Sequence, residues 1–207
     1  MKVVLYGASG TIGSRILNEL ISRNHEVTAV ARHPAKVNAP GVRILAGDVL
    51  DASAVAAAAQ GADAAISAYS PGGEPEKLLA ATKSLISGLS KAGVRRFLMV
   101  GGAGSLEVAP GQKLYDSPDF SAAWKAVALA HGDALALLKR SDLDWTNLSP
   151  AAYIEPGQRT GTFRLGKDAL LVDESGESRI SAEDYAVALV NELEHPQHVR
   201  QRFTVGY

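Results

Sequence analysis

A glycine-rich loop near the start of the chain joins an apolar run to a segment of helical period. Gly7, Gly10 and Gly13 are spaced three residues apart in the stretch YGASGTIG. In such a loop the first glycine permits a tight turn, the second lets the backbone approach a phosphate, and the third lets a helix pack closely on a strand. The pattern predicts a βαβ unit that binds a dinucleotide. The alternative is that these glycines serve only turning and packing.

Short apolar runs alternate with segments of helical period along most of the chain. We expect strands at 2–6, 26–30, 42–46, 62–67, 95–100 and 144–149, and helices at 12–23, 52–60, 76–92 and 121–140. Right-handed crossovers then favour an α/β fold, a doubly wound parallel sheet with helices on both faces and the strand order 3-2-1-4-5-6. A last helix is expected between the N-cap Ser181 and Pro196, followed by a strand at 203–206.

The length of 207 residues favours one compact domain, 1–207, in which 150–207 form a small subregion on the substrate side. A formal net charge of −1 gives no drive toward nucleic acid or an anionic membrane, so neither is expected as a partner. The absence of cysteine, and of carboxylates clustered with histidines, predicts no metal site. No leader segment precedes the first strand, so we expect a cytoplasmic protein, a monomer or homodimer, that acts on a small molecule.

The helix after the glycine loop directs its first N–H groups and its positive dipole end toward the predicted phosphate site. Pyrophosphate binding is therefore assigned to Gly7, Ser9, Gly10, Thr11, Ile12 and Gly13.

The end of the second strand predicts which dinucleotide is bound. An acidic residue there receives the ribose 2′-hydroxyl of NAD, whereas this chain has Arg32, with His33 and Lys36 close by. A guanidinium forms paired, charge-assisted hydrogen bonds with a 2′-phosphate. We therefore expect NADP(H) to be preferred over NAD(H). The alternative is that Arg32 is a solvated loop cation.

The ends of the third and fourth strands complete the predicted cofactor site. In AGDVLD, Asp48 is expected to accept a hydrogen bond from the adenine amino group while Val49 packs on the ring. Asp51 is the expected N-cap of the next helix, and Asp48 has this capping role as its alternative. Ala68 and Tyr69 are expected to pass the pyrophosphate and the nicotinamide.

The chain resembles the atypical short-chain dehydrogenase/reductase superfamily in the stretches GASGTIG, AGDVLD and SRISAEDYAVALV. In VGGAGSLEV and LSPAAYIEPGQRTGTFRLG it is similar to the bacterial NADH-flavin reductases, relatives of biliverdin reductase B and of NmrA-like proteins. The resemblance runs over nearly the whole length. It implies an NAD(P)-binding Rossmann fold and hydride transfer from NADPH to a flavin (FMN or riboflavin) or quinone-like acceptor.

One departure from that superfamily bears on the chemistry. Its standard members reduce carbonyls with a tyrosine, a lysine four residues later and a nearby serine. No tyrosine here has that lysine, and Gly101 and Gly102 stand where a serine pair is expected. Carbonyl reduction and an NAD-dependent epimerase or dehydratase activity lose support, whereas a flavin or quinone delocalises the charge and needs only binding and orientation. A non-catalytic NADP(H)-sensing regulator fits equally well.

Ligands of doubly wound sheets bind beyond the carboxyl ends of the strands. Gly101, Gly102, Pro150 and Tyr153 are therefore expected to position the nicotinamide and the acceptor.

The remaining candidates surround that edge. Tyr115, Phe120 and Trp124, in the irregular stretch 107–124, are expected to form an aromatic slot for a flat acceptor, with ordinary loop packing as the alternative. Ser105 and His131 are the candidate catalytic residues. His131 serves as an acid or orienting donor in one reading and as a structural histidine in the other.

Overall fold

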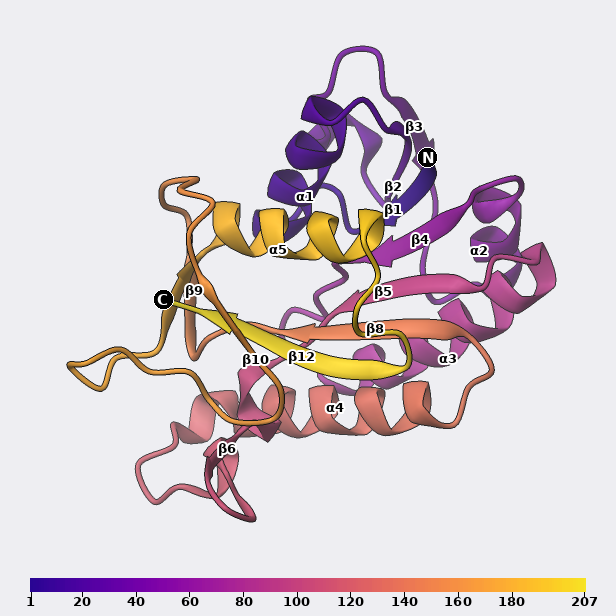
Figure 1. Cartoon of the computed structure of the whole chain (residues 1–207). Helices are drawn as coiled ribbons and strands as arrows, with labels where there is room; N and C mark the ends of the chain where they lie inside the picture. The colour runs from indigo at the N-terminus through magenta and orange to yellow at the C-terminus, as the bar shows by residue number, and fades with distance from the viewer.

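The computed structural model describes all 207 residues and is built around an eight-stranded sheet (Figure 1). Its strands are β1 (Lys2–Tyr6), β2 (Glu26–Ala31), β3 (Arg43–Ala46), β4 (Ala64–Ser67), β5 (Arg96–Val100), β8 (Asp144–Ser149), β10 (Arg164–Gly166) and β12 (Gln201–Gly206). They lie in the order β3-β2-β1-β4-β5-β8-β12-β10, and every neighbouring pair is parallel except β10 with β12. The doubly wound parallel sheet and the order 3-2-1-4-5-6 of its first six predicted strands are confirmed. The last predicted strand, β12, extends the sheet beyond β8.

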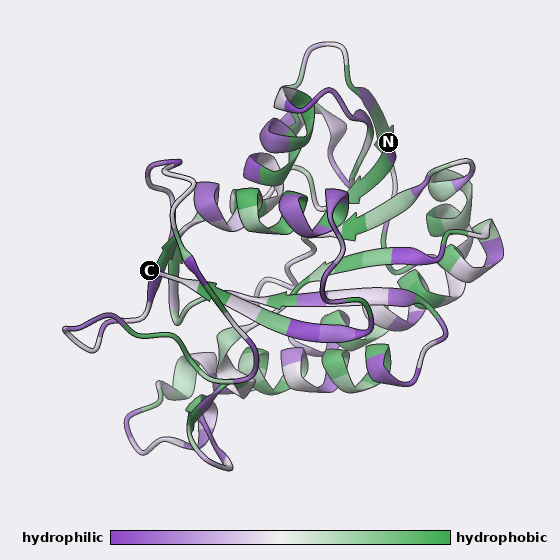
Figure 2. Cartoon of the chain, in the orientation of Figure 1, coloured by the Kyte–Doolittle hydropathy of each residue, from purple (hydrophilic) through white to green (hydrophobic).

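Five α-helices cover the sheet: α1 (Thr11–Ser22), α2 (Ala52–Ala59), α3 (Glu76–Ala92), α4 (Ala122–Lys139) and α5 (Ala182–Glu194). Helices α1 and α5 pack together on one face, whereas α2, α3 and α4 pack in succession on the other, as Figure 1 shows. Figure 2 shows hydrophobic residues along the central strands that these helices cover. Strands buried on both faces are expected to be almost continuously apolar, and all four residues of β4, AAIS, are buried.

The sheet separates two hydrophobic cores. Because successive side chains of a strand point to opposite faces, Leu5 of β1 lies in the core under α1 and α5 with Ile16 and Tyr185. Its neighbour Tyr6 lies in the core under α2, α3 and α4 with Phe97. Trp145 is 2% exposed and packs in that second core.

Two helix starts confirm the predicted N-caps. The Asp51 carboxylate accepts hydrogen bonds from the N–H groups of Ser53 and Ala54 at the start of α2. The Ser181 hydroxyl accepts from the N–H of Asp184 in α5, and that helix ends at Glu194, before Pro196. Each cap satisfies N–H groups that have no partner inside the helix.

The regions between helices contain short elements that the sequence did not predict. Strands β6 (Glu107–Ala109) and β7 (Gln112–Lys113) form a small hairpin, and β9 (Tyr153–Glu155) pairs with β11 (Arg179–Ser181). The 3-10 turns are η1 (Pro34–Lys36), η2 (Ala103–Ser105) and η3 (Leu114–Asp116). Elements of two or three residues are too short to show a hydrophobic period. None of the helices is long and apolar enough to cross a membrane.

Candidate functional site

Two glycines of the loop after β1 are required by the chain's own packing. Gly7 has φ +81°, and a Cβ there would lie 2.6 Å from the carbonyl oxygen of Ala68. A Cβ on Gly13 would lie 2.0 Å from the carbonyl oxygen of Gly7. Both distances are shorter than real Cβ contacts, so only glycine permits this turn and the close approach of α1 to the end of β1.

The middle glycine differs, because nothing within the protein requires it. Gly10 has φ −78°, which any residue adopts, and a Cβ there would be 3.5 Å from its nearest neighbour, the Gly7 carbonyl oxygen. Gly10 is the N-cap of α1 and supplies no side-chain cap, so the first N–H groups of the helix are open. The space above them and the helix dipole suit an anionic group, and the loop therefore fits a pyrophosphate.

A pocket of about 200 Å³ opens beside this loop, at the carboxyl ends of the strands. It is lined by Gly7, Ser9, Gly10, Val30, Ala31, Arg32, His33, Lys36, Gly47, Val49, Ala68, Tyr69 and Ser70. The predicted residues Thr11, Ile12 and Gly13 follow in the first turn of α1. The structure thus brings the glycine loop together with the ends of β2, β3 and β4. Gly47 and Ser70 were missed, although each follows a predicted strand at the same edge as the residues that were chosen.

Basic side chains without partners lie along the wall of the pocket. Arg32, His33 and Lys36 are exposed along its wall, and the side chains of all three lack hydrogen-bond or ion-pair partners in the protein. Tyr69 lies within electrostatic reach of Arg32: burial raises the pKa of its hydroxyl and the cation opposes that rise. The free cations of Arg32 and Lys36 beside an open helix N-terminus favour a ligand with more than one phosphate.

Asp48 and Val49 lie in the turn after β3. Val49 is buried and lines the pocket. The Asp48 side chain is exposed, and its Oδ1 accepts a hydrogen bond of 3.0 Å from the N–H of Leu50. This bond stabilises the turn, while Oδ2 makes no hydrogen bond in the protein. The adenine contact of Asp48 stays a prediction.

The second half of the candidate site lies where β5 and β8 end. Gly101 follows β5 and donates its N–H to the Leu148 carbonyl, 2.8 Å away. A Cβ on Gly101 would lie 2.4 Å from Oδ1 of Asn147, and a Cβ on Gly102 would lie 2.8 Å from Cγ of His131. The two glycines thus let the backbone pass close to β8 and to the imidazole of α4, which explains why no serine pair stands here.

His131 is a buried ionisable group at this edge. Burial lowers the pKa of its imidazole to about 4, because desolvation disfavours the charged form. Its Nδ1 is buried without a hydrogen-bond partner. At neutral pH the ring is therefore uncharged, with one nitrogen unsatisfied by the protein.

Ser105 is held by a residue that the sequence analysis missed. Its hydroxyl oxygen accepts a hydrogen bond of 2.8 Å from Nη1 of Arg202, which also donates to the Ser105 carbonyl at 3.1 Å. Arg202 is bound in turn to Asp168. No hydrogen bond joins Ser105 to His131. Arg202 and Ser105 are 97 residues apart in sequence, so no local pattern connects them.

The other predicted substrate-side residues lie outside the pocket by the glycine loop. Tyr115 accepts a hydrogen bond from Lys113 through its hydroxyl, Phe120 is half-buried, and Trp124 is 66% exposed on the first turn of α4. Pro150 is buried and Tyr153 is 64% exposed. The aromatic slot and the nicotinamide contacts therefore stay predictions.

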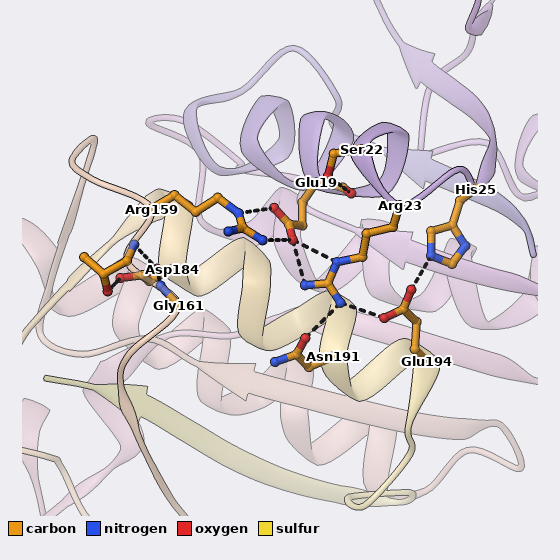
Figure 3. A network of polar contacts seen from close by, with 10 residues as sticks. Glu19, Ser22, Arg23, His25, Arg159, Gly161, Asp184, Asn191 and Glu194 are labelled. Atoms are coloured by element: carbon orange, nitrogen blue, oxygen red, sulfur yellow. Dashed lines mark hydrogen bonds and ion pairs between the residues drawn. The ribbon is translucent and has the colours of Figure 1, made fainter.

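A second hollow, of about 740 Å³, lies between α1, α5 and the segment 156–161, and has no hydrophobic lining. Figure 3 shows its centre, where Glu19 is 5% exposed and accepts hydrogen bonds from both Arg23 and Arg159. These hydrogen bonds hold the pKa of the Glu19 carboxyl below its ordinary value. The charges are paired, so this hollow is a structural link between the helix of the glycine loop and the C-terminal third of the chain.

Residues 7–196 match the model of a family described as NAD(P)H-binding. The chain therefore belongs to the NAD(P)H-binding family, which agrees with the Rossmann-type sheet and the pocket at its glycine loop. The predicted resemblance to reductases of the atypical short-chain dehydrogenase/reductase group is confirmed by this match and by the solved structures below.

Three crystal structures resemble the protein along its whole length. A Burkholderia pseudomallei protein described as a "putative exported protein" is 51% identical, with a TM-score of 0.93 and 100% of both chains covered. A "putative epimerase" from Bacteroides thetaiotaomicron is 47% identical, with a TM-score of 0.93 and 100% and 96% covered. A "putative NADH-flavin reductase" from Streptococcus pneumoniae is 35% identical, with a TM-score of 0.88 and 100% and 99% covered.

Proposed function

We propose that the protein is an NADPH-dependent reductase that transfers hydride to a flavin (FMN or riboflavin) or to a quinone-like acceptor. The observation that carries the cofactor assignment is a group of basic side chains without partners in the protein, Arg32, His33 and Lys36, on the wall of a pocket that begins at an open helix N-terminus. The name of the Streptococcus pneumoniae relative supports the acceptor class.

In this proposal different residues of the pocket bind different parts of the cofactor. The first N–H groups of α1 bind the pyrophosphate, which approaches through the space beside Gly10. Arg32 binds the 2′-phosphate, and Val49 packs on the adenine. The bound nicotinamide supplies a hydride, and the protein's task is to hold it against the acceptor with water excluded.

The substrate side suits a flat, conjugated acceptor. The ring is proposed to lie beside the backbone of Gly101 and Gly102, whose missing side chains let Asn147 and His131 pack closely at the ends of β5 and β8. His131 is uncharged at neutral pH, so it neither repels a cationic nicotinamide nor serves as a strong acid. An acceptor that delocalises charge and takes its proton from solvent needs no tyrosine and lysine pair.

The name of the Bacteroides thetaiotaomicron relative suggests sugar chemistry, which requires an acid/base group at the reacting carbon. Four residues after Tyr115, Tyr153 and Tyr185 stand Asp119, Gly157 and Leu189, and none is a lysine. This pattern favours hydride transfer to a flavin or quinone over epimerisation.

The test is the steady-state loss of NADPH absorbance with and without FMN, with NADH run beside it. The variant is Arg32→Asp, with Arg43→Asp as the matched control, since Arg43 is an exposed arginine at the start of β3 without ion pairs. We expect Arg32→Asp to raise the KM for NADPH about 10- to 100-fold, the value of a charge-assisted pair, and to leave that for NADH within about threefold. Equal losses for both cofactors would refute the 2′-phosphate assignment.

The same experiment separates catalysis from sensing. FMN-dependent oxidation that prefers NADPH supports the reductase. NADPH binding seen by fluorescence, without oxidation by FMN or a quinone, refutes it and favours the non-catalytic NADP(H)-sensing regulator.

A further inference from the structure

Arg202 is a largely covered cation with no role in the hydride transfer proposed above. It lies on β12, and its side chain is only 9% exposed. Nε and Nη2 donate to the carboxylate of Asp168, which is 61% exposed. Nη1 donates to the carbonyl and to the hydroxyl oxygen of Ser105. The guanidinium therefore fixes one serine side chain from two directions, through its backbone and through its Oγ.

These bonds determine what the Ser105 hydroxyl can do. A hydroxyl has one hydrogen to donate and lone pairs with which to accept. Its oxygen accepts from a cation here, and its hydrogen has no acceptor within the protein. A positive donor on the oxygen polarises the O–H bond and strengthens it as a hydrogen-bond donor. Ser105 is thus an oriented donor without a partner.

The Ser105 hydroxyl lies at the edge where ligands of doubly wound sheets bind. Ser105 ends the turn η2, which follows β5 directly after Gly101 and Gly102. On the other side, its Cβ lies 4.0 Å from the point that a Cβ on Gly132 would occupy, next to His131 in α4. Ser105 therefore lies between the glycines proposed to face the nicotinamide and the helix that borders the acceptor.

We infer that Arg202 is a positioning residue that holds the Ser105 hydroxyl as the donor to the acceptor atom on which negative charge develops. The inference rests on the proposed function and deepens it. A hydride carries two electrons and one proton from NADPH, leaving NADP⁺ and an anionic reduced acceptor, which then takes one proton from solvent. The acceptor class is accordingly a conjugated ring whose carbonyl oxygen gains this charge, as in a flavin or quinone. A preorganised donor at such an atom lowers the barrier.

A merely structural role for Arg202 predicts a different set of effects. Asp168→Asn keeps an acceptor oxygen for Arg202 but removes the charge that neutralises it, so the donor role predicts an unchanged or faster reaction. A structural role predicts that Asp168→Asn and Arg202→Gln are both harmful. Arg202→Lys keeps the positive charge and should restore part of the rate. The control is Arg200→Gln, because Arg200 precedes the same strand and binds only the Ser141 carbonyl.

The first measurement is single-turnover reduction of FMN by NADPH. We expect Ser105→Ala and Arg202→Gln each to lower the rate constant about 10- to 100-fold, as for loss of one preorganised donor. The double variant should lose little more than either single variant, because both remove the same bond. The Kd for NADPH should stay within about threefold, since neither residue lines the cofactor pocket.

The second measurement does not depend on turnover. 4-Nitrophenol is a flat ring whose oxygen becomes anionic on titration, and its absorbance reports the phenolate. When 4-nitrophenol is bound to the NADP⁺-loaded wild type, it should lose its proton at a lower pH than in free solution. The variants Ser105→Ala and Arg202→Gln should abolish this shift. A wild type without the shift, or variants that keep it together with full rate, overturns the donor role alone. A wild type that reduces neither FMN nor a quinone overturns the proposed function.

Discussion

The loop glycines are needed for different physical reasons, and two substitutions distinguish packing at Gly13 from ligand space at Gly10. Gly13→Ala places a Cβ 2.0 Å from the carbonyl oxygen of Gly7. Ordinary contact begins near 3.4 Å, and a Cβ fixed to its Cα meets a backbone oxygen here, so neither atom can rotate away and the backbone of α1 must move by more than an ångström. Gly10→Ser meets no such obstacle, because its Cβ would have 3.5 Å to its nearest neighbour and its φ of −78° suits serine.

The magnitudes follow from these distances. Overpacking of this kind costs about 1–3 kcal/mol, so Gly13→Ala should lower the free energy of unfolding by that amount and Tm by several degrees. Serine is a better N-cap than glycine by a few tenths of a kcal/mol, so Gly10→Ser should leave the cofactor-free protein as stable as the wild type or slightly more so. Its hydroxyl would, however, take the N–H groups proposed for the pyrophosphate. NADPH affinity should therefore fall about tenfold or more, the value of a charge-assisted hydrogen bond.

The assays are urea unfolding without cofactor and fluorescence titration with NADPH, on both variants. We expect Gly13→Ala to lose stability, whereas Gly10→Ser should keep its stability and lose affinity for NADPH. If Gly10→Ser binds NADPH as tightly as the wild type, the space beside Gly10 does not serve the pyrophosphate. If it destabilises the protein as much as Gly13→Ala does, the distinction between the glycines is wrong.

Three further predictions concern single side chains. The pKa of His131 is lowered to about 4 from 6.5, so the unfolded chain binds more protons between those values. Stability should fall as pH drops through that window, by up to about 3 kcal/mol, and urea unfolding of His131→Gln should lack this part of the pH dependence. The Glu19 pKa lies below its ordinary 4.5, so its ion pairs stabilise the fold above that pH and are lost as pH falls through the lowered pKa. Glu19→Gln should be less stable at pH 7, and its free energy of unfolding should fall less steeply as the pH decreases. An unchanged slope would exclude these ion pairs as the cause of the loss of stability in acid. Trp124→Ala should change stability by less than about 0.5 kcal/mol because the ring is exposed, yet raise the KM for FMN, and an unaltered KM removes Trp124 from the acceptor site.

The parts of the fold that sequence could predict are those with a repeating signal. Helix α3 was predicted with its observed bounds, Glu76–Ala92, because its apolar residues recur at helical spacing over many turns. The strand order was predicted as that of a doubly wound dinucleotide-binding fold, which the glycine loop and the alternation of strands with helices indicated. The pairing of β9 with β11 had no comparable signal, because each strand has three residues and their partners lie far apart in sequence.

The candidate site shows the same division. Gly7, Arg32 and Val49 could be placed at one pocket because each lies within three residues of the end of a predicted strand, and parallel strands end at one edge. The bond between Arg202 and Ser105 could not be predicted, since the hydrophobic alternation of β12 says which face Arg202 occupies but not which loop arrives there. Contacts between distant segments are decided by the packed fold, which local pattern does not encode.

The two separated cores have a consequence for engineering. Residues beneath α1 and α5 rarely touch residues beneath α2, α3 and α4, because the sheet stands between them. Substitutions without shared neighbours add nearly independently. A library directed at a new acceptor can therefore vary the α4 side, from Tyr115 to His131, without retuning the packing of α1, which carries the glycine loop. Such a chain offers two nearly independent regions for directed evolution, the α4 side for the acceptor and the packing of α1 with α5 for stability.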